Sequence, residues 1–203
     1  MGLAQDHVQN HPQNHPQIQW IGFGDSEHIG GRPVVDAHRL GLWFFLATVV
    51  MLFAGFTSAI LVRRTSADWQ AIPLLPLLRW NTLVLLASSV TLERVRTLVR
   101  RDRRRQVRTW LAVTALLGVL FLAGQMGAWE QYRALGLFLS SNPHSSFFYI
   151  LSGVHGAHLA GGLFGLGYLL ARPGRVAAVN LCATYWHFLG GLWLYLLGML
   201  FVV

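Results

Sequence analysis

Residues 146–170 read SFFYILSGVHGAHLAGGLFGLGYLL, and this stretch decides the fold class. It contains no acidic residue, no lysine and no arginine. The hydrocarbon core of a bilayer is about 30 Å thick, and a helix needs about 20 residues to cross it. Because lipid offers no hydrogen bonds to an open backbone, an apolar run of this length predicts a transmembrane helix.

Four further segments of the chain are apolar, and one of them is weaker than the rest. That weaker segment is short and contains Arg79 and Asn81, but Arg79 lies near its start, where a long side chain reaches the headgroups. The chain is 54% hydrophobic and only 12% charged, against about 25% charged in soluble domains. We therefore predict an all-α polytopic membrane protein, a bundle of five transmembrane helices within residues 38–203. The expected spans are about 40–62, 76–92, 110–129, 146–170 and 179–203.

The first 37 residues have a different composition. Residues 7–19 read HVQNHPQNHPQIQ, in which QNHP occurs twice in tandem. Such a segment has too little apolar surface to offset the entropy of ordering it. Residues 1–37 are therefore predicted to be a disordered polar tail, and Pro12 and Pro16 disfavour a helical metal site built from its histidines.

The basic residues indicate how the helices are oriented. The net charge is +8, all 16 basic residues are arginine, and half of them lie between the second and third predicted spans. These eight are Arg94, Arg96, Arg100, Arg101, Arg103, Arg104, Arg105 and Arg108. With five spans, 12 of the 16 arginines share one side, which predicts a cytoplasmic N-terminus and a periplasmic C-terminus. Topology and contact with anionic lipid explain this basic loop better than nucleic acid, which is not an expected partner.

Polar residues inside the spans are the candidates for function. His155, His158 and His187 lie within predicted spans, no acidic residue lies within a span, and none is expected beside any of these histidines to orient its ring. One interpretation is a small bis-His b-type membrane cytochrome, because His158 and His187 differ in predicted depth by only about 6 Å. The alternative is hydrogen bonding between helices, which we favour.

Other chemistry has little support in the residues. The single cysteine, Cys182, excludes an internal disulfide and any CxxC motif. With acidic residues confined to loops and helix ends, no Ser–His–Asp arrangement can be assembled. We expect neither catalytic residues nor metal ligands, and small residues four apart, such as Gly153, Ala157 and Gly161, predict close helix packing.

Four motifs together resemble subunit III of the haem–copper respiratory oxidases, in its short five-helix bacterial form. They are LGLWFFLATVVMLFAGF at residues 40–56, LPLLRWNTLVLLASSVT at 75–91, GVHGAHLAGG at 153–162 and TYWHFLGGLWLYL at 184–196. The HGxH and YWHF elements are specific in this order and at this separation.

The resemblance implies a non-catalytic subunit of a proton-pumping cytochrome c oxidase, which reduces oxygen in aerobic respiration in the bacterial inner membrane. Such a subunit packs on subunit I, joins the other oxidase subunits, holds structural phospholipid, and supports stability and proton uptake. It binds no cofactor itself, and the haems and copper lie in partner subunits. The related alternative is the homologue associated with quinol oxidases or nitric oxide reductase.

The resemblance also implies roles for single residues. Lipid binding is expected for Arg172, His155, His158, Trp186 and His187, and motif packing for Asn81, Gly153, Gly156, Gly161 and Tyr185. The family's membrane glutamate, its acid before YWHF and its aspartate after it are replaced here. Val49, Asn180 and Gly190 stand in their places. Proton delivery through those carboxylates is therefore not carried over to this chain.

Overall fold

The computed structural model describes residues 37–101, 103–172 and 175–201. They form five helices: α1 (Ala37–Arg63), α2 (Pro76–Arg100), α3 (Arg104–Ala134), α4 (Pro143–Ala171) and α5 (Val176–Phe201). The polar tail predicted for residues 1–37 lies, except for Ala37, outside the described residues.

Three of the helices, α1, α3 and α4, are long and apolar enough to cross a membrane. The other two have 25 and 26 residues, but charged residues in α2 and the Tyr185–His187 segment of α5 lower their hydropathy. The predicted all-helical membrane bundle is confirmed. The side of the membrane that each terminus faces stays a prediction from the arginine distribution.

Local sequence signals explain where two of the helices stop and start. At the start of α4, the Asn142 side chain accepts a hydrogen bond from the Ser145 backbone N–H, and the Ser145 hydroxyl accepts one from Asn142. This capping box is followed by Pro143 in the first helical turn. At the end of α3, Gly136 adopts a φ of +76°, and the N–H of Leu137 bonds back to the Tyr132 carbonyl. This glycine-dependent turn ends the helix.

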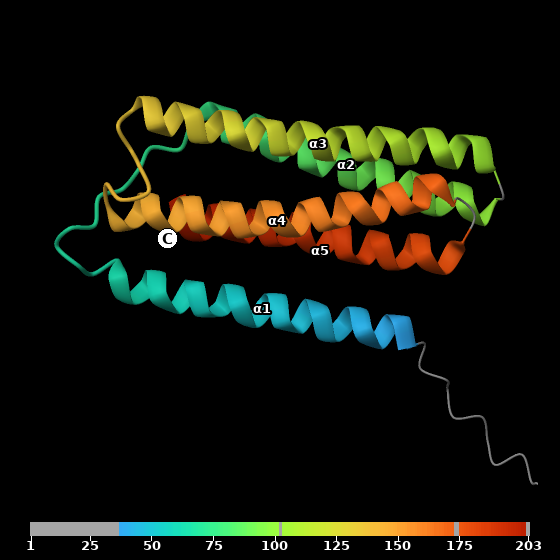
Figure 1. Cartoon of the computed structure of the whole chain (residues 1–203), viewed down its shortest axis with the longest axis horizontal. Coiled ribbons are helices and arrows are strands. Elements are labelled where there is room, and N and C mark those ends of the chain that lie inside the picture. Colours follow the sequence, from blue (N-terminus) through green and yellow to red (C-terminus); the bar gives the residue numbers. More distant parts are fainter. Residues whose placement is uncertain (1–36, 102, 173–174, 202–203) are drawn as a thin grey trace, which may run out of the picture. The chain divides into compact units, whose positions relative to one another are not determined.

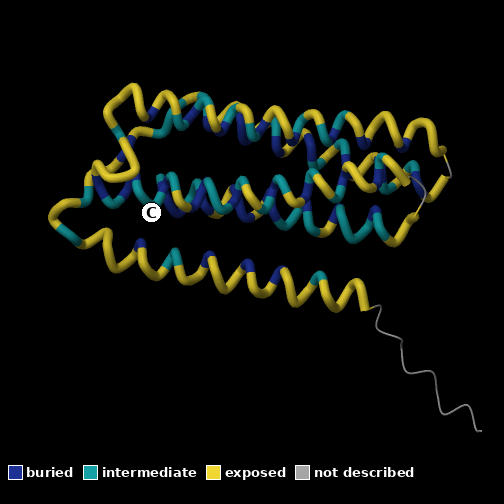
Figure 2. The backbone as a smooth tube through the Cα atoms, viewed as in Figure 1, coloured by how far each residue is buried: buried dark blue, intermediate teal, exposed yellow. Residues whose placement is uncertain are grey.

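The helices pack as two hairpins with α1 alongside (Figure 1). The α2–α3 hairpin contacts the α4–α5 hairpin through α2 with α5 and α3 with α4, while α1 contacts only α4 and α5. The buried residues of α1 are Leu46, Val49, Phe53 and Ile60, which recur at helical spacing along one stripe. Most of the rest of α1 is exposed (Figure 2). The core is therefore built mainly by α2–α5, and α1 adds Val49, Phe53 and Ile60 to one side of it.

Candidate functional site

Trp186 joins all four helices of the core. It projects from α5 and is fully buried, and its indole Nε1 donates a hydrogen bond of 2.9 Å to Ser88 Oγ on α2. The ring lies against Gly118 on α3, where an added Cβ would come within 2.8 Å of Trp186 Cη2. It also lies against Gly162 on α4, where an added Cβ would come within 3.2 Å of the ring. No sequence signal marks these two glycines, because only the fold brings a tryptophan to them.

Three other aromatic side chains with a polar group are anchored in the same way, of which Trp193 and Tyr132 are buried and Trp129 is partly buried. Trp193 donates to Thr82 Oγ1 at 3.0 Å, and Trp129 donates to Ser152 Oγ at 3.0 Å. The Tyr132 hydroxyl donates to the Pro73 carbonyl at 2.7 Å. A buried polar group without a partner costs about 1–3 kcal/mol. These bonds between elements therefore let the bundle bury amphipathic aromatic rings where no bulk water is available.

His155 lies at the centre of the bundle with an exposure of 0%. Its ring centroid is 5.1 Å from that of Trp193 and 6.1 Å from that of Phe121, which approaches edge-on. Neither ring nitrogen has a hydrogen-bond partner among the described residues. The lipid contact predicted for His155 and Trp186 would require the bundle to open, so in the packed arrangement both are packing residues.

His158 faces a different neighbour, the outlying helix α1. Its ring lies 6.2 Å from the rings of Phe45 and Phe53, and its Nδ1 lies 2.8 Å from the Val154 carbonyl of its own helix. Its backbone carbonyl accepts a 2.8 Å hydrogen bond from the Tyr185 hydroxyl. This histidine marks the junction of α1, α4 and α5.

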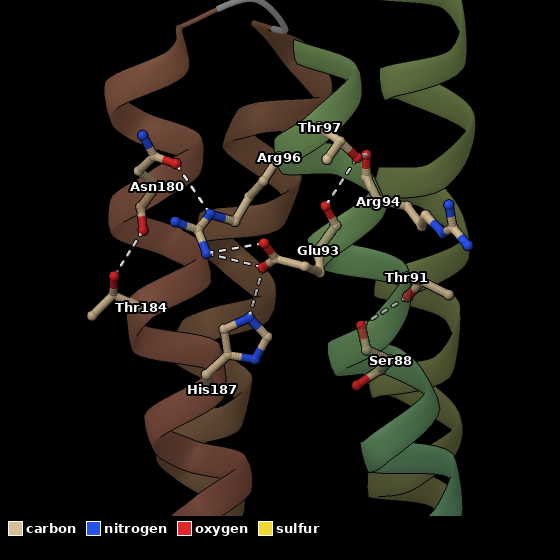
Figure 3. Close-up of polar contacts among 9 residues, drawn as sticks. All are labelled: Ser88, Thr91, Glu93, Arg94, Arg96, Thr97, Asn180, Thr184 and His187. Carbon is tan, nitrogen blue, oxygen red and sulfur yellow. Dashed lines mark hydrogen bonds and ion pairs between the residues drawn. The ribbon is translucent and has the colours of Figure 1, made fainter. Parts of the chain in front are cut away.

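His187 faces α2, and here the structure corrects the sequence analysis. No acidic residue lies near His187 in the sequence, yet its Nε2 lies 3.4 Å from Glu93 Oε2. Glu93 also forms an ion pair with Arg96, whose Nη1 lies 2.9 Å from Glu93 Oε2. Arg96 Nε in turn donates a hydrogen bond of 3.2 Å to Asn180 Oδ1 (Figure 3). The four side chains form one polar network between α2 and α5. The only sequence signal for it was the Glu93–Arg96 spacing of three on one helix.

The bis-His haem interpretation requires two histidines that face a common space. Tyr185, which contacts His158, and His187 are two residues apart on α5, about 200° around the helix. His158 and His187 therefore point toward opposite sides of α5, one to α1 and one to α2. Among the described residues, no group of three or more His, Cys, Asp or Glu could hold a metal ion.

The remaining motif residues take ordinary packing positions. Asn81 is buried and donates from Nδ2 to the Phe121 carbonyl at 3.0 Å, and its side chain occupies the space where a Cβ at Gly124 would lie. An added Cβ at Gly153 or Gly156 would make ordinary contacts of 3.6 Å, with Trp129 and Leu122. At Gly161 the nearest side-chain atom would be the Tyr185 hydroxyl at 4.0 Å.

Arg172 ends α4 and is exposed. Its guanidinium carbon lies 5.8 Å from the centre of the Tyr168 ring one turn earlier. The α2–α3 connection lies at this same end of the bundle (Figure 1). The basic loop predicted for residues 94–108 is mostly helical: Arg94, Arg96 and Arg100 belong to α2, and Arg104, Arg105 and Arg108 belong to α3. The helices continue there because Val95, Val99 and Val107 are buried, while the arginines other than Arg96 are exposed.

The opposite end of the bundle carries two features that the sequence did not indicate. His144 accepts a 3.1 Å hydrogen bond from the Ile72 backbone N–H and stacks on Trp69 with ring centroids 4.9 Å apart, which fixes the α1–α2 connection against α4. Asp68 pairs with Arg63 at 2.7 Å beside a cavity of about 810 Å³ between α1 and α4. A hydrogen bond from Ser66, with the nearby Arg63 charge, holds the pKa of Asp68 below its ordinary value.

Fold and site together define a helical membrane protein in which buried tryptophan, tyrosine and asparagine side chains form hydrogen bonds between elements. Residues 25–203 match the family described as cytochrome c oxidase subunit III. The chain belongs to this family, which confirms the resemblance carried by the HGxH and YWHF motifs.

Named relatives agree with this assignment. The chain is 30% identical over 191 residues to "Cytochrome c oxidase subunit 3" of Thermostichus vulcanus, covering 87% of this chain and 92% of that protein. It is 32% identical over 190 residues to "Probable cytochrome c oxidase subunit 3" of Nocardia farcinica, with the same coverage. For the "Cytochrome c oxidase subunit 3" of Alkalihalophilus pseudofirmus, the values are 31% over 180 residues, covering 81% and 85%.

Proposed function

We propose that this chain is the non-catalytic subunit III of a bacterial proton-pumping cytochrome c oxidase. It packs directly on subunit I in the inner membrane and leaves haem and copper to the partner subunits. The observation that carries this proposal is the use of the motif side chains within the bundle. Trp186 donates a hydrogen bond to Ser88, Trp193 to Thr82 and Tyr185 to the His158 carbonyl. These groups therefore serve as a scaffold rather than a reaction centre.

The subunit also holds phospholipid at its lipid-facing surface. Support comes from Arg172, which is exposed at the end of α4 on the predicted cytoplasmic side, at headgroup depth. His158 and His187 are only partly buried and complete the set of candidate lipid contacts, whereas His155 and Trp186 act through packing.

The subunit supports oxidase stability and proton uptake indirectly. Among the described residues, the acidic side chains are Asp68, Glu93 and Glu130, and all three are exposed. A relay of buried carboxylates through this bundle is therefore not part of the proposal. The subunit acts instead by holding subunit I and its surrounding lipid in place.

Purification in mild detergent tests the proposal. We expect the full chain to be recovered with a haem-bearing partner subunit, identified by mass spectrometry and by its visible absorption spectrum. Recovery of the chain alone as a stable monomer would contradict subunit membership. A Soret band in the chain purified without partners, lost on His158→Ala or His187→Ala, would instead establish the b-type cytochrome interpretation.

A further inference from the structure

A second candidate site lies where three helix ends meet, away from Arg172. It is a cavity of about 620 Å³, within the range of about 300–1,000 Å³ typical of ligand sites. The start of α1, the end of α2 and the start of α5 each contribute residues about one turn apart, so each presents one face to the cavity. The lining is His38, Arg39, Leu42, Trp43, Arg96, Arg100, Val176, Ala177, Asn180, Leu181 and Thr184.

The charged part of this lining is basic. His38, Arg39, Arg96 and Arg100 line the cavity, and none of the described acidic side chains does. Arg39 and Arg100 are exposed, and neither forms a hydrogen bond or ion pair with another described residue. Their positive charges are therefore available to an anion.

Arg96 is held in place by the network that links α2 and α5. Its Nε bonds to Asn180 Oδ1 at 3.2 Å, and its Nη1 bonds to Glu93 at 2.9 Å, as Figure 3 shows. A guanidinium has five N–H donors, and here the two on Nη2 bond to no described protein atom. The cavity is thus lined by one oriented guanidinium whose Nη2 donors are unused and by two exposed arginines without a described partner.

The cavity changes character along the helix axes. On α1, His38 and Arg39 lie at the helix start, and one turn deeper the lining is Leu42 and Trp43. On the predicted topology this is the border between headgroups and hydrocarbon on the cytoplasmic side, the depth at which tryptophan is enriched. A soluble anion would use only the basic half of such a site, whereas a phospholipid uses both halves.

We propose that this cavity binds the phosphate headgroup of an anionic phospholipid, held by Arg39, Arg96 and Arg100, with its acyl chains along Leu42, Trp43 and Leu181. This inference deepens the lipid-holding part of the proposed function and assigns it a second site with its own residues. Because it concerns the full chain in detergent, its test does not depend on recovery of an oxidase partner.

The test compares retention of phosphatidylglycerol and phosphatidylcholine by the purified full-length chain, measured by native mass spectrometry. The variant Arg39→Gln/Arg100→Gln removes two charges from the cavity, and we expect retention of phosphatidylglycerol about 30-fold weaker. That fold-change corresponds to about 1 kcal/mol for each arginine at a membrane surface. The matched control is Arg101→Gln/Arg105→Gln, which removes the same charge from exposed positions outside the cavity.

Two further measurements separate this site from general attraction of anions. Ala177→Trp fills the cavity without changing any charge, and we expect it to release phosphatidylglycerol as well. Excess inorganic phosphate should leave the lipid bound, because the acyl chains contribute to binding. The proposal is overturned if the control loses as much lipid as the cavity variant, if folded Ala177→Trp protein retains phosphatidylglycerol at the wild-type level, or if free phosphate displaces the lipid.

Discussion

Replacing Gly118 by alanine should destabilise the bundle through Trp186. The added Cβ would lie 2.8 Å from Trp186 Cη2 and 2.9 Å from Leu163 Cδ2, both shorter than a carbon–carbon contact allows. Trp186 cannot easily move away, since Gly162 also lies close to its ring and Ser88 holds its Nε1. Overpacking a filled core costs about 1–3 kcal/mol.

The assay is thermal unfolding of the full-length chain in mild detergent, followed by circular dichroism. For a chain of about 200 residues, the expected cost lowers the Tm by about 2–12 °C. The matched control is Gly167→Ala on α4, where an added Cβ meets nothing within 4 Å. There the higher helix propensity of alanine should leave the Tm unchanged or raise it.

A second variant shows whether the tryptophan ring is responsible. Trp186→Phe shortens the ring, so it should relieve the clash created by Gly118→Ala. The double variant should therefore lose less stability than the sum of the two single variants, by at least about 0.5 kcal/mol. If Gly118→Ala melts at the same temperature as Gly167→Ala, or if the two changes are additive, the packing argument for Trp186 is incorrect.

Three further outcomes follow from the same contacts. Thr82→Val leaves the buried Trp193 Nε1 without an acceptor. It should lower the free energy of unfolding by about 0.6–1.7 kcal/mol, the range for polar pairs between membrane helices, and an unchanged Tm in detergent would contradict this. Glu93→Gln should cost less than about 1 kcal/mol despite its two partners, because the side chain is 52% exposed. A larger fall in the Tm of the chain in detergent would contradict this. Arg172→Ala should reduce the phospholipid that co-purifies with the complex and quicken the loss of oxidase activity during turnover. Equal lipid content in wild type and variant would remove that role.

The sequence predicted the helices well because their signals are local. Length and hydropathy decide whether a segment crosses a bilayer, and all five predicted segments contain helices. Helix ends are less local, and α2 runs to Arg100 rather than ending near Leu92. There Val95 and Val99 are buried, so packing on neighbouring helices extends the helix among charged residues that hydropathy alone places outside a span.

The candidate site was only partly predictable. Trp186 and His187 were identified as candidates, but their partners Ser88 and Glu93 lie 98 and 94 residues away in the sequence. The predicted absence of an acid beside any histidine was wrong for the same reason, because Glu93 reaches His187 across two helices. Spacing along one chain does not encode such pairings.

By itself, the sequence determined that this protein is a five-helix membrane bundle of the oxidase subunit III type, since hydropathy and the HGxH and YWHF motifs are properties of contiguous residues. Only the tertiary structure decided what the polar residues do. The rotation of α4 and α5 about their axes decides that His155 faces the core, His158 faces α1 and His187 faces α2. That rotation is set by packing of all the helices at once, such as Trp186 against Gly118 and Gly162, because no single helix can bury such a ring alone.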